Sequence, residues 1–262
     1  MILEVVHTTR LSYDQPIAET VMEVRLEPQD SAQQSVRQFS LTVVPKVELR
    51  SYLDGFGNRV HYFNHVAPHD RVEVTSRSLV ETISGGRLEP EAFPEDYLYF
   101  RPPVLDVPGV RRWAATFERG ELEDRLEALA NAINREFDYV PETTDVFTAV
   151  DTVLKLKRGV CQDFAHLFVA ICRAMGVPAR YVSGYIHSGV GRVGAGASHA
   201  WAEAYLPGTG WIGYDPTNPT RVGENHIRLA VGRDYMDASP TRGTYLGVAA
   251  ETMKVTVSTR VL

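Results

Sequence analysis

The sequence predicts an α+β protein, in which an all-β segment is followed by helices and then by further strands. Three observations predict this class. Residues 1–84 are rich in β-branched and aromatic side chains, several of them alternating with polar ones. Apolar side chains recur at helical spacing only from residue 121 onwards. The strands expected after those helices do not alternate with helices, which argues against a doubly wound parallel sheet.

Residues 1–84 are expected to form a small N-terminal β domain of the sandwich type. The segment Asp54-Gly55-Phe56-Gly57-Asn58 is typical of a hairpin turn, because an Asp-Gly step supplies positive φ angles cheaply. The strands expected in this domain are 2–13, 20–26, 36–44, 47–53, 60–63 and 72–80.

Residues 85–110 are expected to form an extended connector, because this stretch is crowded with proline, which lacks a backbone N–H and fixes φ. Residues 111–262 then form the second domain. Its helices are expected at 121–137, at 146–157 with Asp145 as the N-cap, and at 161–175, where Gly176 and Pro178 end the helix. Its strands are expected at 180–186, 198–206, 211–214, 227–231 and 253–261.

Composition excludes several classes of function. The 262 residues carry 27 Lys+Arg against 33 Asp+Glu, a net charge of -6, so no clustered basic surface is offered to nucleic acid. No apolar run reaches the length of a membrane span, and residues 1–16 do not resemble a signal peptide. Two cysteines make no disulfide framework. We therefore expect a cytoplasmic protein with neither a nucleic acid nor a membrane as partner.

Cys161 is the candidate nucleophile. A glycine turn, Arg158-Gly159-Val160, delivers it to the first turn of an apolar helix, where free N–H groups and the helix dipole stabilise a thiolate. A small, unreactive core residue is the alternative. Cys172 lies about 16 Å further along the same helix, so no disulfide joins the two, and its place on the apolar stripe predicts a core residue.

His199 is the candidate base. It begins a strand on which His199, Trp201 and Glu203 share one face while alanines occupy the other, a face suited to packing against the helix of the cysteine. Asp215 ends the next strand. If the two strands pair through the turn at 207–210, its carboxylate returns to His199 and can fix the tautomer of the imidazole. The alternatives are a half-buried structural histidine and a simple Asp-Pro turn.

The other histidines offer no expected chemistry, and we expect neither a metal ion nor a cofactor. Four of them point away from the helix start or have no chemical neighbour in the sequence: His7, His166, His187 and His226. The evenly spaced His61, His65 and His69 would lie about 13 Å apart along a strand, too far for one ion. Residues 189–194 match a GxGxxG pattern but precede a strand rather than a helix, so they are expected to form a loop between strands rather than a dinucleotide site. The sequence leaves open whether the glycine-rich loop 188–197 is a lid over the cleft.

Four motifs, in order, resemble those of the transglutaminase-like superfamily. They are Gly159-Val160-Cys161-Gln162-Asp163-Phe164-Ala165, Ala179-Arg180-Tyr181-Val182-Ser183-Gly184-Tyr185, Ser198-His199-Ala200-Trp201 and Gly213-Tyr214-Asp215-Pro216-Thr217-Asn218. The first 80 residues are similar to the N-terminal domain of bacterial members described as cysteine proteases. The resemblance implies a papain-like core of helices packed on an antiparallel sheet. It also implies that Cys161 is the nucleophile, His199 the base and then the acid, and Asp215 the residue that orients His199. No acidic loop resembles the calcium sites of animal members, so calcium dependence is not implied.

The expected function is thiol-dependent acyl transfer on a peptide or protein amide through a thioester, by hydrolysis or by transfer to an amine. The backbone N–H of Cys161 and the side chain of Tyr139 are candidate oxyanion donors. Gln162, Trp201 and Trp211 are candidate substrate-binding residues. A non-catalytic module that binds a protein or peptide on the same fold is the alternative, and the sequence leaves the oligomeric state open.

Overall fold

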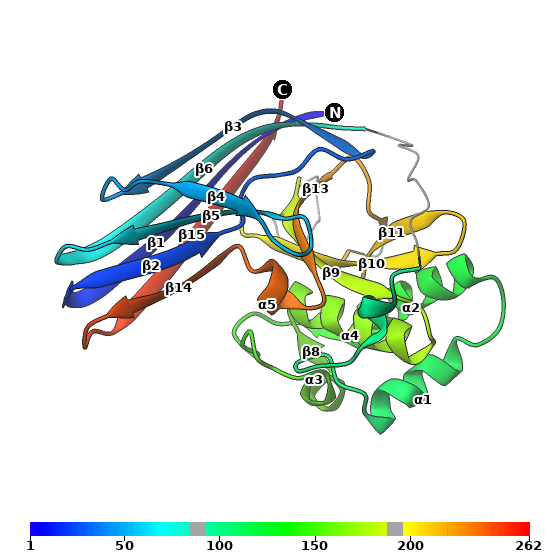
Figure 1. Cartoon of the computed structure of the whole chain (residues 1–262). Helices are drawn as coiled ribbons and strands as arrows, with labels where there is room; N and C mark the ends of the chain where they lie inside the picture. Colours follow the sequence, from blue (N-terminus) through cyan, green and yellow to red (C-terminus); the bar gives the residue numbers. More distant parts are fainter. Residues whose placement is uncertain (84–92, 188–195, 219) are drawn as a thin grey trace.

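The predicted α+β class is confirmed by a computed structural model that describes residues 1–83, 93–187, 196–218 and 220–262. Two antiparallel sheets built mainly from the first third of the chain form one side of the molecule, and a further antiparallel sheet with helices packed on it forms the other (Figure 1). Both termini lie at the same end of the first two sheets. Among the described residues, no helix is long and apolar enough to cross a membrane.

The N-terminal strands lie close to their expected positions. They are β1 (Ile2–Ile17), β2 (Glu19–Val24), β3 (Gln34–Val44), β4 (Arg50–Leu53), β5 (Arg59–His65) and β6 (His69–Thr82). Alternate residues of β1 and β6 are buried, as a half-buried strand requires. The core between the sheets includes Leu3, Val24, Phe63 and Val80, each at most 2% exposed.

Two C-terminal strands complete these N-terminal sheets. β14 (Thr241–Leu246) pairs with β2, and β15 (Glu251–Val261) pairs with β1 over eleven residue pairs, giving the sheet orders β14-β2-β5-β4 and β15-β1-β6-β3. The strand at 253–261 was expected within the second domain, residues 111–262, and no strand was expected at β14. Alternation along a strand predicts extended backbone, but it does not say which distant strand the edge will pair with.

The helices of the second half are η1 (Glu95–Leu98), α1 (Pro108–Thr116), α2 (Leu122–Glu136), α3 (Val150–Leu156), α4 (Cys161–Ala174) and α5 (Tyr235–Ala238). The sequence did not predict η1, α1 or α5, and the start of α3 differs from expectation. α1 begins inside the expected connector, since proline is tolerated in the first turn of a helix. α3 begins at Val150 because Asp145 closes a turn instead, accepting hydrogen bonds from the Phe147 N–H and the Thr148 hydroxyl, both at 2.9 Å.

The sheet of the second half has the order β12-β11-β10-β9-β13. Its strands are β9 (Ala179–Ile186), β10 (His199–Leu206), β11 (Gly210–Asp215), β12 (Thr220–Arg221) and β13 (His226–Gly232). Ala202 and Ala204 of β10 share one core with Phe164 and Phe168 of α4. Their short side chains let the helix that begins at Cys161 lie close to the strand that begins at His199.

Candidate active site

Cys161 is the first residue of α4, and Asp163 fixes the start of that helix. Its Oδ2 accepts hydrogen bonds from the Val160 N–H at 2.8 Å and from the Thr144 hydroxyl at 2.6 Å. A Cβ on Gly159 would lie 2.6 Å from the same oxygen, so the turn needs a glycine there. The half-buried thiol of Cys161 therefore lies at a helix N-terminus whose free N–H groups favour negative charge.

A two-residue parallel ladder brings Tyr139 close to the cysteine. β7 (Asp138–Tyr139) pairs with β8 (Arg158–Gly159), so Tyr139 lies opposite Gly159, two residues before Cys161. Burial and the nearby Cys161 and Asp163 side chains raise the pKa of Tyr139 to about 12. The phenol hydroxyl consequently keeps its proton at neutral pH and can act as a hydrogen-bond donor beside the thiol.

The hairpin of β10 and β11 brings Asp215 to His199. The two strands pair from Ala202 opposite Tyr214 to Leu206 opposite Gly210. The Nε2 of His199 lies 2.8 Å from Oδ2 of Asp215, and neither side chain is exposed. The other oxygen of the Asp215 carboxylate is also fixed. Oδ1 accepts hydrogen bonds from the backbone N–H groups of Thr217 at 2.9 Å and Asn218 at 3.1 Å. Asp215 therefore has one fixed orientation against the imidazole.

Charge and burial act in opposite directions on this pair. Burial on its own would lower the pKa of His199, but Asp215 and Cys161 outweigh it and raise this pKa to about 10. Burial would raise the pKa of Asp215, but the hydrogen bonds and charges of His199 and His226 hold it well below its ordinary value. At neutral pH the pair is therefore an imidazolium and a carboxylate.

The second ring nitrogen of His199 is the one available to the thiol. Nδ1 is buried, and no hydrogen-bond partner meets it among the residues that the structure describes. Cys161 nevertheless lies close enough to contribute to the raised pKa of the ring. Since Asp215 occupies Nε2, Nδ1 is the ring nitrogen left to interact with the sulfur of Cys161.

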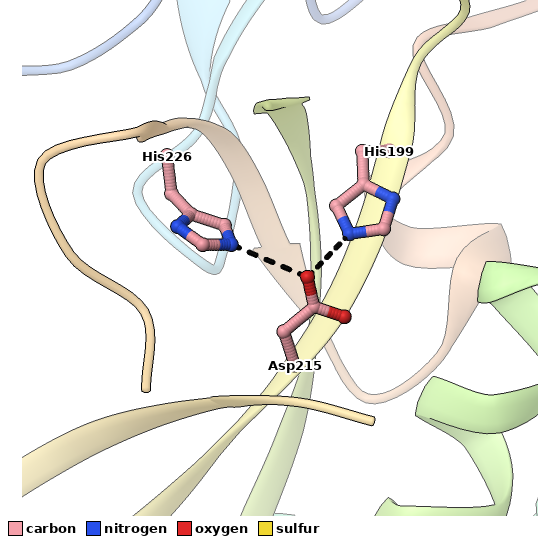
Figure 2. Close-up of side chains that lie close together, drawn as sticks. All are labelled: His199, Asp215 and His226. Carbon is pink, nitrogen blue, oxygen red and sulfur yellow. Dashed lines mark hydrogen bonds and ion pairs between the residues drawn. The ribbon is translucent and has the colours of Figure 1, made fainter. Parts of the chain in front are cut away.

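His226 is a member of this group that the sequence analysis passed over. It is the first residue of β13, and its Nε2 lies 3.3 Å from Oδ2 of Asp215. Figure 2 shows His199 and His226 directing one ring nitrogen each at the same carboxylate oxygen. No motif marks His226 in the sequence. It lies immediately before the expected strand 227–231, and the order of strands in the sheet is what places it here.

The side chains of His199, Asp215 and His226 lie close enough together to hold a metal ion. Their ligand atoms all lie within 4.8 Å of one another, as a site of two imidazoles and one carboxylate would require. A metal-bound imidazole donates its other ring N–H to an acceptor. Nδ1 of His226 instead accepts the Gly223 N–H at 3.3 Å, so the ring carries its proton on Nε2, facing Asp215. The arrangement fits a hydrogen-bonded group better than a set of metal ligands.

The other expected site residues have structural contacts. Trp201 is 1% exposed and lies against His226, with ring centroids 5.2 Å apart, and its expected role as a wall of the acyl site stays a prediction. Trp211 stacks on the Arg180 guanidinium at 4.1 Å, and both side chains line a cavity, so its expected role in substrate binding stays a prediction. Gln162 is half-buried and donates a hydrogen bond to the Val146 carbonyl at 3.2 Å.

Cys172 is fully buried, as its place on the apolar stripe predicted. The candidate lid is the loop 188–197, and most of it lies outside the described residues. Its role therefore stays a prediction.

Comparisons with known proteins agree with one another. The model of the transglutaminase-like superfamily matches residues 111–216, and that of the bacterial transglutaminase-like N-terminal region matches residues 3–81. An uncharacterised protein of Mycobacterium leprae is 36% identical over 97% of each chain. A protein-glutamine gamma-glutamyltransferase of Pseudomonas aeruginosa is 32% identical over 44% of this chain and 19% of its own length. The solved structure of a candidate cysteine protease from Cytophaga hutchinsonii has a TM-score of 0.79 at 22% identity, covering 100% of this chain and 92% of that one.

Proposed function

This chain belongs to the transglutaminase-like superfamily, and from that premise we propose that it catalyses thiol-dependent acyl transfer on a peptide or protein amide. The predicted family and the predicted papain-like architecture are both confirmed. The observation that carries the proposal is the buried His199–Asp215 pair at 2.8 Å, set beside a cysteine at the first residue of a helix. In this proposal Cys161 is the nucleophile, His199 the base and acid, and Asp215 the orienting residue.

The first half-reaction forms a thioester. The thiolate of Cys161 attacks the amide carbonyl carbon, and the carbonyl π electrons move to the oxygen. The Cys161 backbone N–H and the Tyr139 hydroxyl stabilise this oxyanion by donating hydrogen bonds. When the oxyanion collapses, the carbon–nitrogen bond breaks, and Nδ1 of His199 gives its proton to the leaving nitrogen. Ammonia or an amine departs, and the acyl group stays on the sulfur.

The second half-reaction releases the acyl group. Nδ1 of His199 now accepts a proton from the incoming nucleophile, while Asp215 holds the ring through Nε2 and stabilises the imidazolium that forms. The nucleophile adds to the thioester carbonyl carbon, and the carbon–sulfur bond then breaks to return the Cys161 thiolate. Water as the nucleophile gives a carboxylic acid and completes an amide hydrolysis. A primary amine gives a new amide and completes a transfer, the reaction named for the Pseudomonas relative. Both outcomes follow from one thioester, so the proposal covers both.

The experiment is incubation with a glutamine-containing peptide, with and without a labelled primary amine, in wild type, Cys161→Ser and Cys172→Ala. We expect ammonia release that Cys161→Ser abolishes and Cys172→Ala preserves. Incorporated amine identifies a transferase, and ammonia without incorporation identifies a hydrolase. Wild-type turnover retained in Cys161→Ser refutes the mechanism.

Labelling with iodoacetamide at pH 6 separates an enzyme from a binding module on the same fold. We expect Cys161 to react faster than a free thiol, because an imidazolium neighbour stabilises the thiolate. Labelling at the rate of a free thiol, together with absent turnover, would leave the binding module as the better interpretation.

We also propose that the protein works in a reducing compartment, the cytoplasm, because both of its cysteines are free thiols. Cell fractionation with an antibody against the chain tests this, and recovery outside the cytoplasmic fraction would contradict it.

A further inference from the structure

We propose that His226 is a positioning residue of this site, which acts through Asp215 by donating its Nε2–H to the oxygen that also faces His199. The inference rests on the proposed function, because positioning Asp215 matters only if His199 performs proton transfer. It adds a fourth side chain, from a third strand, to the cysteine, histidine and aspartate. His226 touches neither substrate nor sulfur in this proposal and is therefore not a catalytic residue.

The first support is the crowding of donors around one oxygen of Asp215. Oδ2 receives His199 Nε2 at 2.8 Å, the Asn218 side-chain amide at 3.1 Å and His226 Nε2 at 3.3 Å. Oδ1 meanwhile accepts two backbone N–H groups. A carboxylate offers about four lone-pair positions, so both oxygens are saturated and the group cannot rotate without breaking hydrogen bonds.

The second support is that His226 is itself fixed, with its proton on the required nitrogen. The Gly223 N–H occupies Nδ1, which leaves Nε2 as the protonated nitrogen facing Asp215. The Trp201 ring packs edge-on against the imidazole at an interplanar angle of 74°. The side chain is 3% exposed, and its backbone is paired with Ile186 of β9. These contacts hold the buried ring of His226 with its Nε2–H directed at Asp215.

The hydrogen bond from His226 changes how strongly the Asp215 carboxylate attracts His199. The groups facing Asp215 are His199 and His226, and Cys161 faces His199. A hydrogen bond from His226 takes up part of the negative charge on Oδ2, so His199 is attracted less strongly than by a carboxylate without that bond. We therefore expect loss of the His226 donor to raise the pKa of His199. The imidazolium then releases its proton to the leaving nitrogen less readily, and kcat falls.

Two substitutions of His226 distinguish a role as hydrogen-bond donor from a role in filling space. His226→Phe keeps a ring of similar size and removes the donor. His226→Gln places an amide N–H near the former Nε2 and cannot titrate. We expect His226→Phe to lower kcat about 10- to 100-fold with KM changed less than about twofold, because proton transfer and not binding is affected. We expect His226→Gln to recover at least about a third of wild-type kcat. The matched control, His61→Gln, makes the same change in the N-terminal domain and should leave kcat unchanged.

A second readout needs no turnover. Nitrogen-15 NMR of the histidine side chains should show His226 protonated at Nε2 in the wild type, and His199 titrating at higher pH in His226→Phe than in wild type. If the wild-type chain turns over no amide, the proposed function fails while these signals still decide the role of His226. A His226 protonated at Nδ1 would overturn the proposal, and so would a pKa of His199 that is unchanged in His226→Phe. Equal losses of kcat in His226→Phe and His226→Gln would overturn it as well. Melting curves of each variant confirm that it is folded.

Discussion

Replacing Asp215 by asparagine should remove the negative charge that faces the His199 imidazole, with little change in the shape of the side chain. The amide oxygen can still accept the Thr217 and Asn218 backbone N–H groups that now reach Oδ1. The amide NH₂ then replaces Oδ2, so His199 loses its acceptor and meets a donor instead. The fold should persist, while the tautomer and charge of His199 change.

The size of the effect follows from the pKa of His199. Its rise from 6.5 to about 10 corresponds to roughly 5 kcal/mol in favour of the imidazolium, after the cost of burial has been met. Because this folded-state pKa is raised, the stabilisation is complete below pH 6.5 and is lost as pH rises through about 10. In Asp215→Asn burial remains and the carboxylate charge is gone, so we expect the pKa of His199 to fall to 6.5 or below. We expect kcat to fall about 10³-fold or more.

The assay is the rate of Cys161 alkylation by iodoacetamide between pH 5 and pH 10, in a Cys172→Ala background so that only one thiol reports. The wild type should react readily at pH 6, because the imidazolium stabilises the thiolate. The Asn variant should react at pH 6 no faster than a free thiol, about a hundredfold more slowly than the wild type. Superimposable pH profiles for the two proteins would refute the reasoning, provided that both melt cooperatively.

Three further substitutions test the surroundings. Tyr139→Phe removes the proposed oxyanion donor and should lower kcat about 100-fold at similar KM, measured by steady-state kinetics; an unchanged kcat excludes the role. Gly159→Ala forces a Cβ against the Asp163 carboxylate and should lower the free energy of unfolding by about 2 kcal/mol in urea titrations, whereas Gly55→Ala, in open space, should not. Arg173→Met leaves four buried or half-buried backbone carbonyls without their guanidinium donor. It should cost about 4 kcal/mol, and a loss below about 1 kcal/mol would contradict the assigned role.

Short-range sequence patterns predicted those elements of the site whose residues lie close together along the chain. The expected helix 161–175 is observed at Cys161–Ala174, because an apolar stripe and a glycine stop signal are both short-range features. The two strands that carry His199 and Asp215 pair through a short turn, as expected from their spacing. The approach of the two side chains follows from that hairpin.

The interpretation of Trp201 and Trp211 as substrate-binding residues rests on the sequence pattern alone and stays a prediction. Alternation places an aromatic ring on one face of a strand but does not say what packs over that face. Here Trp201 and Trp211 contact His226 and Arg180 respectively.

The sequence by itself determined the class of fold, the family, and the positions of the helices and strands that hold the cysteine, the histidine and the aspartate. The fold class and the element positions follow from periodicity and turn chemistry within about twenty residues, where backbone geometry leaves few choices. The family follows instead from the resemblance of four motifs. Only the tertiary structure decided that β14 and β15 return to the first sheets, and that His226 joins Asp215 from β13. Strand edges offer the same N–H and C=O groups whatever their side chains, so their pairing is settled by the packing of the whole chain.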